Sequence, residues 1–225
     1  MRSNRLAQAV VFGGLMFFAA SHAPGLFGES ATNEGVGLAG KTPPRKRSPL
    51  LDYKFTNELG QAVSISDFHG QALAITFFFT RCPMPEFCPR LSKNFQEASR
   101  KLSASSEGFT NWHFLSITFD PVIDTPAVLK AYAERYEYDP RHWSFLTGPE
   151  DKIREFARLS GVKADPDNGL INHNFRTLII DATNHLQMVF PMGGDLSEAI
   201  VSEMRKAGAV ARPRSREAIT TIPAK

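Results

Sequence analysis

The chain has 225 residues, of which 42% are hydrophobic, including 18 phenylalanines. This length and composition suffice for one sizeable hydrophobic core with appended segments. The formal net charge of +3 argues against a nucleic-acid-binding protein, and many of the basic residues gather in two flanking runs, 41–47 and 212–216. We therefore expect one globular domain with solvated basic flanks.

The N-terminus has the pattern of an export signal. Arg2 and Arg5 precede a largely apolar run, 6–20, and the small residues "AASHA" follow. The run is short for a bilayer span, which needs about 20 residues. We expect residues 1–23 to be a signal peptide, with an uncleaved anchor in the inner membrane as the alternative. The protein is then periplasmic or in the cell envelope, where a disulfide can form and persist, and only this segment would contact the membrane.

Composition divides the rest of the chain into a linker, a domain and a tail. Residues 24–49 are rich in Gly, Pro and charge and show no sustained period. From Leu50 the pattern becomes periodic. We expect a folded domain over 50–209 and a basic flexible tail over 210–225.

Strand and helix patterns alternate along the domain. Two short strands flank a turn at Gly60, and the continuous apolar run "ALAITFFF" (72–79) is typical of a strand in the interior of a sheet. A helix follows Cys88, because Pro89 suits its first position and apolar residues recur at helical spacing over 89–104. This arrangement places Cys88 at the N-cap of the helix.

The same alternation continues toward the C-terminus. We expect a buried strand over 112–120, a helix over 124–136 that is capped by Thr125, and a short strand over 143–148. A helix over 149–161 that ends at Gly161, a strand pair over 176–181 and 185–190, and a closing helix over 195–208 follow. This order predicts an α/β fold with a central mixed sheet that is flanked by helices and preceded by an N-terminal hairpin.

The two cysteines, Cys82 and Cys88, lie in the loop "CPMPEFC" between the interior strand and the helix. The helix N-terminus favours negative charge and Arg81 acts in the same direction, so a thiolate forms more readily there. A continuous helix would separate residues six apart by about 9 Å, too far for a disulfide. Because Pro85 disfavours a helix, we expect 83–87 to form a turn that can bring the sulfurs together for pairing or joint metal ligation.

Two thiolates make an incomplete site for most metals, so the six histidines are candidates for a third ligand. His173 lies in a loop just before a strand, from which it can face the cysteine loop across the end of the sheet. The other five suit the signal segment or surface and structural positions: His22, His69, His113, His142 and His185. From these residues alone, a metal site, a redox-active dithiol and a structural disulfide all remain open.

Several stretches together resemble the Sco/SenC family, thioredoxin-like copper-binding proteins that help to assemble the copper site of cytochrome c oxidase. The resemblance covers roughly residues 50–207 and rests on "TNELGQAVSISDFHGQALAITFFFTRCP", on the proline after each cysteine, on "SITFDPVIDTPAVLKAYAERY", on "WSFLTG" and on "HNFRTLIID". It implies a thioredoxin-like fold and a copper site made of Cys82, Cys88 and His173, with cysteines that can also cycle between dithiol and disulfide. Two thiolates and an imidazole suit Cu(I), and with further ligands they can hold Cu(II).

The chain departs from the family in the cysteine spacing, because members usually have C-x3-C and this chain has C-x5-C. The longer loop could reposition Cys82 or bring Met84 close enough to act as a thioether ligand, although an apolar loop contact is the simpler interpretation of Met84. Glu86 is either a supporting partner of the site or a solvated residue. Asp120 and Asp124 match the family's "DPxRDTP" block, and we interpret them as strand-end and helix-start residues.

The resemblance implies a metallochaperone that delivers copper by ligand exchange to the copper-site subunit of cytochrome c oxidase or to another exported thiol protein. The alternative is a thiol:disulfide oxidoreductase that acts on exported or oxidase cysteines without copper delivery. In that alternative Cys82 attacks and Cys88 resolves the mixed disulfide. A third possibility is an exported module whose single disulfide only fastens the loop.

Overall fold

The structure is a computed structural model that describes residues 53–210 except 106–107, 168–169, 175 and 192–193. The expected signal peptide and linker lie outside the described residues, as does the tail beyond Val210, and their boundaries stay predictions. Among the described residues, no helix has both the length and the apolar character needed to cross a membrane.

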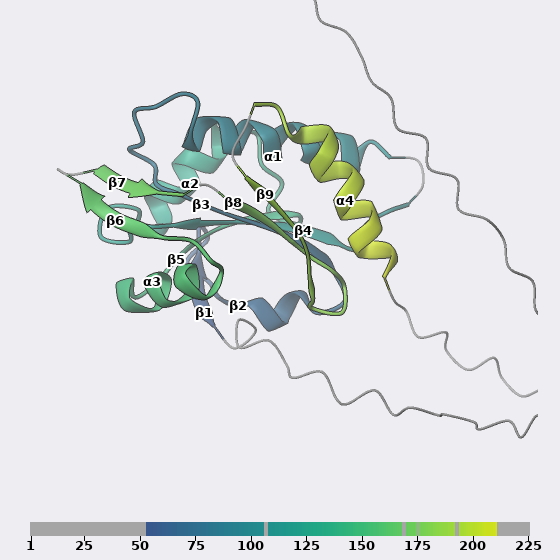
Figure 1. Ribbon diagram of the computed structural model, residues 1–225, viewed down its shortest axis with the longest axis horizontal. Coiled ribbons are helices and arrows are strands. Elements are labelled where there is room, and N and C mark those ends of the chain that lie inside the picture. The colour runs from purple at the N-terminus through teal and green to yellow at the C-terminus, as the bar shows by residue number, and fades with distance from the viewer. Residues whose placement is uncertain (1–52, 106–107, 168–169, 175, 192–193, 211–225) are drawn as a thin grey trace, which may run out of the picture. The chain divides into compact units, whose positions relative to one another are not determined.

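A seven-stranded mixed sheet forms the centre of the domain (Figure 1). Its strands, in spatial order, are β2 (Ala62–Ser64), β1 (Lys54–Asn57), β5 (Trp143–Thr147), β4 (Trp112–Thr118), β3 (Ala72–Phe78), β8 (Arg176–Ile180) and β9 (Leu186–Pro191). The three central strands β3, β4 and β5 are parallel, and the hairpins β1-β2 and β8-β9 add antiparallel strands at the two sides. The predicted α/β fold with a mixed sheet and an N-terminal hairpin is confirmed.

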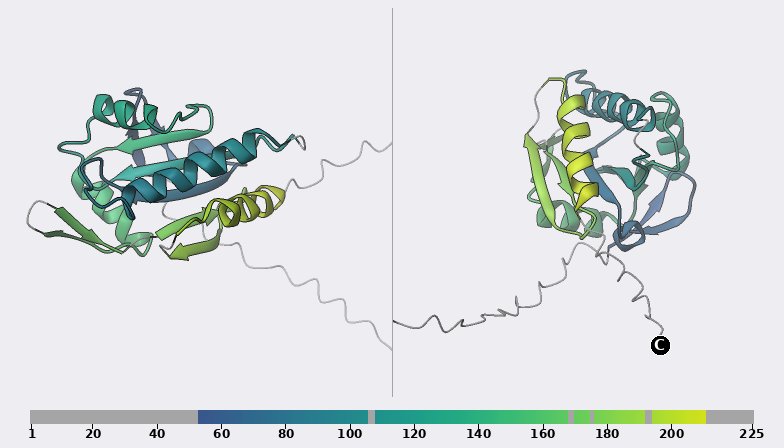
Figure 2. Two further views of the ribbon diagram at one scale, coloured as in Figure 1. Left: turned by 90° about the horizontal axis from the view of Figure 1, so that it is seen from above. Right: turned by 90° about the vertical axis from the view of Figure 1, so that its right-hand side faces the viewer.

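Helices cover both faces of the sheet (Figures 1 and 2). One face carries α1 (Cys88–Ser103), α2 (Pro126–Glu134) and α4 (Ser197–Ala209), and the other carries α3 (Glu150–Leu159) and the 3-10 helix η2 (Ile65–Phe68). Because successive strand residues point to opposite faces, Phe78 of β3 packs in the first layer and Phe77 in the second. Burying one such side chain contributes about 1.5–3 kcal/mol, so the end of β3 is a firm support for the loop that follows.

Helix α1 begins one residue earlier than predicted. Phe87 is the N-cap, because its carbonyl accepts the first helical hydrogen bond from the Leu91 N–H at 3.0 Å. The assignment of Cys88 to the N-cap was therefore wrong, and Cys88 is the first helical residue. Pro89 fits at the second position, since the N–H groups of the first turn have no partner within the helix.

A short hairpin, β6 (Ala164–Asp167) and β7 (Leu170–His173), was not predicted. His173 pairs with Ala164 and ends a strand, so its assignment to a loop was wrong. Pro166 within β6 concealed the strand, because proline is tolerated in a sheet only at edges and bulges. The hairpin forms a separate two-stranded sheet and projects from the end of the main sheet at which β3 leads into the cysteine loop (Figures 1 and 2).

Candidate metal centre

The cysteine loop, residues 79–88, connects the end of β3 to the start of α1. Two backbone hydrogen bonds shape it: the Cys82 N–H donates to the Phe79 carbonyl at 3.3 Å, and the Phe87 N–H donates to the Met84 carbonyl at 3.0 Å. These turns bring the side chains of Cys82 and Cys88 into hydrogen-bond contact. The predicted turn is confirmed, and it overcomes the six-residue separation of the cysteines.

The two cysteines are free thiols in opposite environments. Cys88 is completely buried in the first turn of α1, whereas Cys82 is partly exposed. The hydrogen bond with Cys88 lowers the pKa of Cys82 to about 6. The same bond, together with burial, raises the pKa of Cys88. At neutral pH the exposed sulfur is therefore a thiolate that a buried thiol stabilises.

His173 lies at the same end of the sheet as the cysteine loop. Its ring packs against the ring of Phe119, with centroids 4.7 Å apart, and against that of Phe79, with centroids 6.5 Å apart. Its Nδ1 lies 3.2 Å from the Asn174 carbonyl oxygen. Burial lowers the pKa of His173, so the imidazole is neutral, which is the form that binds metals.

The three predicted ligands do not form one cluster. Within the described ranges, no group of three His, Cys, Asp or Glu side chains could hold a metal ion. The structure brings Cys82 and Cys88 together, and Phe79 links them to His173, since its carbonyl accepts from the Cys82 N–H and its ring contacts the imidazole. The donor types fit soft Cu(I), but a three-ligand site requires the loop or the hairpin to move, and the ligand set stays a prediction.

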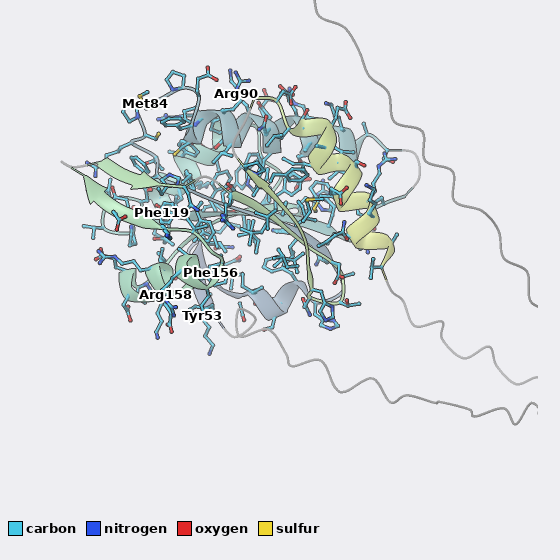
Figure 3. All side chains as sticks on the ribbon, in the orientation of Figure 1. Tyr53, Met84, Arg90, Phe119, Phe156 and Arg158 are labelled. Atoms are coloured by element: carbon cyan, nitrogen blue, oxygen red, sulfur yellow. The ribbon has the colours of Figure 1, made fainter. Side chains whose placement is uncertain are left out.

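The loop also presents Met84 and Glu86 to solvent. Met84 is 49% exposed and lies at the outer edge of the loop (Figure 3). Glu86 is exposed and forms an ion pair with Arg90, whose Nη2 lies 3.4 Å from the carboxylate. The exposure of Met84 does not match a well-packed apolar contact, and the Glu86 side chain is a solvated partner of α1.

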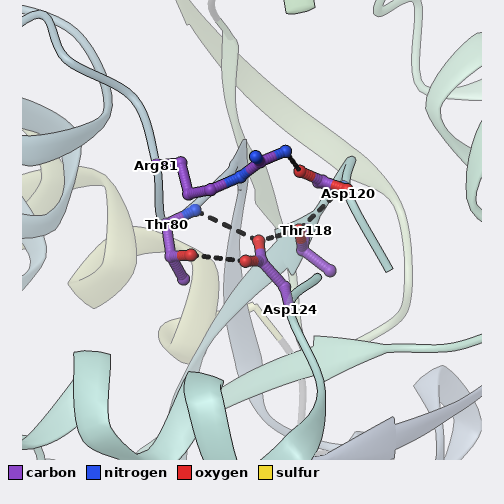
Figure 4. Close-up of polar contacts among 5 residues, drawn as sticks. All are labelled: Thr80, Arg81, Thr118, Asp120 and Asp124. Atoms are coloured by element: carbon purple, nitrogen blue, oxygen red, sulfur yellow. Dashed lines mark hydrogen bonds and ion pairs between the residues drawn. The ribbon is translucent and has the colours of Figure 1, made fainter. Parts of the chain in front are cut away.

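A buried polar network, which the sequence interpretation missed, joins the cysteine loop to the loop after β4 (Figure 4). Asp124 is completely buried. Its carboxylate accepts hydrogen bonds from the Thr80 N–H at 3.1 Å, from the Thr80 hydroxyl, and from the Thr118 hydroxyl at 2.5 Å. Thr80 comes just after β3, and Thr118 is the last residue of β4. Because these two strands are parallel neighbours, their ends lie side by side, and this is the signal that could have revealed the network.

A second pair of side chains reinforces the same junction. Arg81 Nη2 lies 2.6 Å from Asp120 Oδ2, so the residue before Cys82 is tied to the end of β4 (Figure 4). Asp120 and Asp124 do lie at the strand end and before the helix, as interpreted. Their additional effect is to position Cys82 through its two preceding residues.

The other described histidines have surface or structural positions, as predicted. His113 is buried and its Nε2 lies 2.8 Å from Ser144 Oγ. His142 stacks on Trp112 with ring centroids 4.3 Å apart. His69 and His185 lie in turns at the ends of η2 and β8.

The fold and the cysteine loop together define a thioredoxin-like protein with a dithiol at the start of a helix. The family model described as SCO1/SenC matches residues 42–208. The chain therefore belongs to the SCO1/SenC family. The SCO1 protein homolog of Bacillus subtilis is 32% identical over 113 residues, which cover 50% of this chain and 55% of that protein.

Solved structures of Sco proteins have the same fold. BsSco, described as a member of the Sco family of cytochrome c oxidase assembly proteins with a disulfide switch, matches with a TM-score of 0.62 at 24% identity, covering 72% of this chain and 94% of that one. The Arabidopsis thaliana ScoI structure with copper bound matches with a TM-score of 0.59 at 22% identity, covering 68% of this chain and 96% of that one. These likenesses establish the thioredoxin-like fold.

Proposed function

We propose that this protein is an exported copper chaperone that assists assembly of the copper site of cytochrome c oxidase. The observation that carries the proposal is the contact between the partly exposed Cys82 and the buried Cys88 at the start of α1. Two similar proteins support it: Arabidopsis thaliana ScoI has been solved with copper bound, and BsSco is described as belonging to a family of oxidase assembly proteins.

The sulfur pair supplies the chemistry that a copper carrier needs. Two adjacent sulfurs are soft ligands that select Cu(I) over hard ions such as Mg²⁺. Binding releases the proton that Cys88 holds, so Cu(I) affinity rises with pH. Buried Cys88 retains the cargo, and partly exposed Cys82 is the sulfur that a partner's ligand can displace first.

His173 is the third ligand in this proposal. It ends β7, and the β6-β7 hairpin is not part of the main sheet, so a displacement of the hairpin end can bring the imidazole toward the sulfurs. A neutral imidazole is ready to bind without losing a proton. The export pattern in residues 1–23 supports a site outside the cytosol, where the proposed acceptor is the copper-site subunit of the oxidase or another exported thiol protein.

The test is a Cu(I) titration of the reduced full chain in competition with a chromogenic chelator. The variants are Cys82→Ser, Cys88→Ser and His173→Ala, and His69→Ala is the matched control because His69 is an exposed histidine at a turn. We expect one Cu(I) per chain. Each cysteine variant should bind at least tenfold more weakly, His173→Ala should lose less, and His69→Ala should match the parent protein. If the parent chain does not compete for Cu(I), the chaperone proposal fails.

A second function, thiol:disulfide exchange without copper delivery, is favoured by the low pKa of Cys82 beside a buried thiol. Cys82 would form a mixed disulfide with the partner, and Cys88 would displace the partner as a thiol. The complete cycle would survive in His173→Ala and stop in both cysteine variants, because Cys82→Ser cannot attack and Cys88→Ser remains at the mixed disulfide. Exchange that proceeds in a protein unable to bind Cu(I) would therefore identify an oxidoreductase.

A further inference from the structure

Exposed apolar side chains gather in the segment that leads from β4 into α2, beside the cysteine loop. Val122, Ile123 and Val128 are exposed at 75%, 39% and 38%. The loop part of this segment is held to β4 by the Ile123 and Asp124 N–H groups, which donate to the Asp120 carbonyl at 3.1 Å and 2.8 Å. Of these three residues, Val128 also lines a pocket, and an exposed apolar side chain that adjoins a pocket is a candidate for an interaction surface.

A pocket of about 410 Å³ lies between this segment and the start of the cysteine loop. Residues spaced by four along α2 share one helix face, and this face lines one side of the pocket. The pocket residues used below are Thr80 and Arg81 from the loop, and Ala127, Val128, Ala131 and Arg135 from α2 and its C-cap. The floor is thus small and apolar, and the immediate neighbour of Cys82 forms part of the wall.

Two arginines, Arg81 and Arg135, are the charged residues that line the pocket. Arg81 is 55% exposed although one of its nitrogens contacts Asp120, whose carboxylate is 16% exposed. Arg135 is exposed at the C-terminal end of α2. The adjacent exposed charges on that helix, Lys130 and Glu134, are of opposite sign. Two guanidinium groups beside an apolar floor fit a carboxylate that neighbours an apolar side chain.

We propose that this pocket docks the protein that receives copper or electrons, by binding an acidic residue next to an apolar one near the partner's cysteine. The carboxylate pairs with Arg135 and the exposed side of Arg81, and the apolar side chain covers Val128. Arg81 lines the pocket and directly precedes Cys82 in the chain, so in this proposal a segment paired with Arg81 brings its own cysteine toward Cys82. This inference rests on the proposed function only in calling the docked protein the acceptor of copper or electrons.

The test measures thiol exchange at Cys82 in the full chain with Cys88→Ser, without copper. The probes are the peptides Glu-Phe-Gly-Cys, Gln-Phe-Gly-Cys and Lys-Phe-Gly-Cys, each activated as a mixed disulfide with thionitrobenzoate. The Cys82 thiolate attacks the peptide sulfur, the new disulfide joins Cys82 to the peptide, and the bond to thionitrobenzoate breaks. Thionitrobenzoate leaves with the electron pair as a coloured thiolate, and its release gives the second-order rate constant.

We expect the glutamate peptide to react about fivefold faster than the lysine peptide at low ionic strength, with the glutamine peptide between them and the preference shrinking as salt is added. Arg135→Glu should reverse the order. Val128→Ser should slow the exchange of all three peptides. Lys152→Glu is the matched control, because it makes the same charge change at a separate pocket of about 680 Å³ between β1 and α3, and it should leave the order unchanged.

Equal rates for the three peptides would overturn the docking site, as would an effect of Lys152→Glu as large as that of Arg135→Glu. Arg135→Gln is a milder change at an exposed position, and it should abolish most of the preference while the circular dichroism spectrum stays unchanged. A preference that persists in Arg135→Gln would also overturn the proposal. Because the assay contains no copper, its failure is distinguishable from failure of the Cu(I) titration.

Discussion

Removing the carboxylate of Asp124 should loosen the cysteine loop and destabilise the domain. Asp124→Ala deletes the acceptor of the hydrogen bonds from the Thr80 N–H, the Thr80 hydroxyl and the Thr118 hydroxyl, at a position with no solvent exposure. Each buried donor left without an acceptor costs about 1–3 kcal/mol. Because a hydroxyl can rotate toward another acceptor, we expect a total loss of about 3 kcal/mol in the free energy of unfolding. For a domain of this size, that loss lowers the Tm by about 6–12 °C.

Urea denaturation of the reduced protein measures this loss directly. Asp124→Asn keeps one acceptor oxygen and should lose about half as much free energy as Asp124→Ala. Asp151→Ala is the control, since Asp151 is an exposed carboxylate in the first turn of α3 and its removal should cost less than about 1 kcal/mol. An Asp124→Ala protein as stable as the Asp151→Ala protein would refute the role assigned to the network.

Three further outcomes follow from the titratable groups. In the reduced, metal-free protein, the rate of Cys82 alkylation by iodoacetamide should rise with pH through a midpoint of about pH 6 and level off above it. The Cys88→Ala substitution should move this midpoint upward, toward the ordinary thiol pKa of about 8.5. Glutathione disulfide should convert the parent protein to an internal Cys82–Cys88 disulfide, whereas Cys88→Ser should retain a glutathione adduct that mass spectrometry detects. Burial raises the pKa of Glu58, so folding favours its protonated form. The stability that this group contributes is fully present below about pH 4.3 and is lost as the pH rises through its folded pKa. Urea denaturation should therefore show the parent protein losing stability relative to Glu58→Gln over that rise in pH.

Each of these outcomes has a result that contradicts it. An alkylation midpoint unchanged by Cys88→Ala would mean that the neighbouring thiol does not stabilise the Cys82 thiolate. A parent protein that accumulates a stable glutathione adduct would mean that Cys88 cannot reach the mixed disulfide. A stability difference between the parent and Glu58→Gln that is constant with pH would mean that the Glu58 carboxyl ionises as it does in the unfolded chain.

The central strands and helices were predictable because local patterns determine them. The run 72–79 is apolar without interruption, and its strand is buried on both faces of the sheet. The turn between the cysteines was predictable for a similarly local reason, since Pro85 disfavours a helix at that point. The strand and the turn are each determined by residues that are close in the sequence, so the folded structure contains them as predicted.

The supports of the site were not predictable because they join distant segments. Asp124 lies 44 residues from Thr80, and nothing adjacent to either residue indicates their contact. The nearest signal is the parallel pairing of β3 and β4, which places their ends at one edge of the sheet, but the sequence analysis predicted only a mixed sheet and not this pairing. The β6-β7 hairpin was missed for the opposite reason, because a local signal, Pro166, argued against a strand that an isolated two-stranded sheet tolerates.

The three candidate ligands come from different parts of the fold, and for this reason we expect the two cysteines to contribute more to the Cu(I) affinity than His173. Cys82 and Cys88 belong to one turn that β3, α1 and the Asp124 network hold together, so their sulfurs meet in the reduced chain. His173 comes from a separate hairpin and packs on Phe119, so its ligation must offset the loss of that contact. If copper binding draws the hairpin inward, Cu(I) should slow amide hydrogen exchange in β6 and β7, and His173→Ala should abolish this protection while retaining most of the Cu(I) affinity. Loss of all Cu(I) binding in His173→Ala would instead mean that the cysteine pair alone cannot hold the metal.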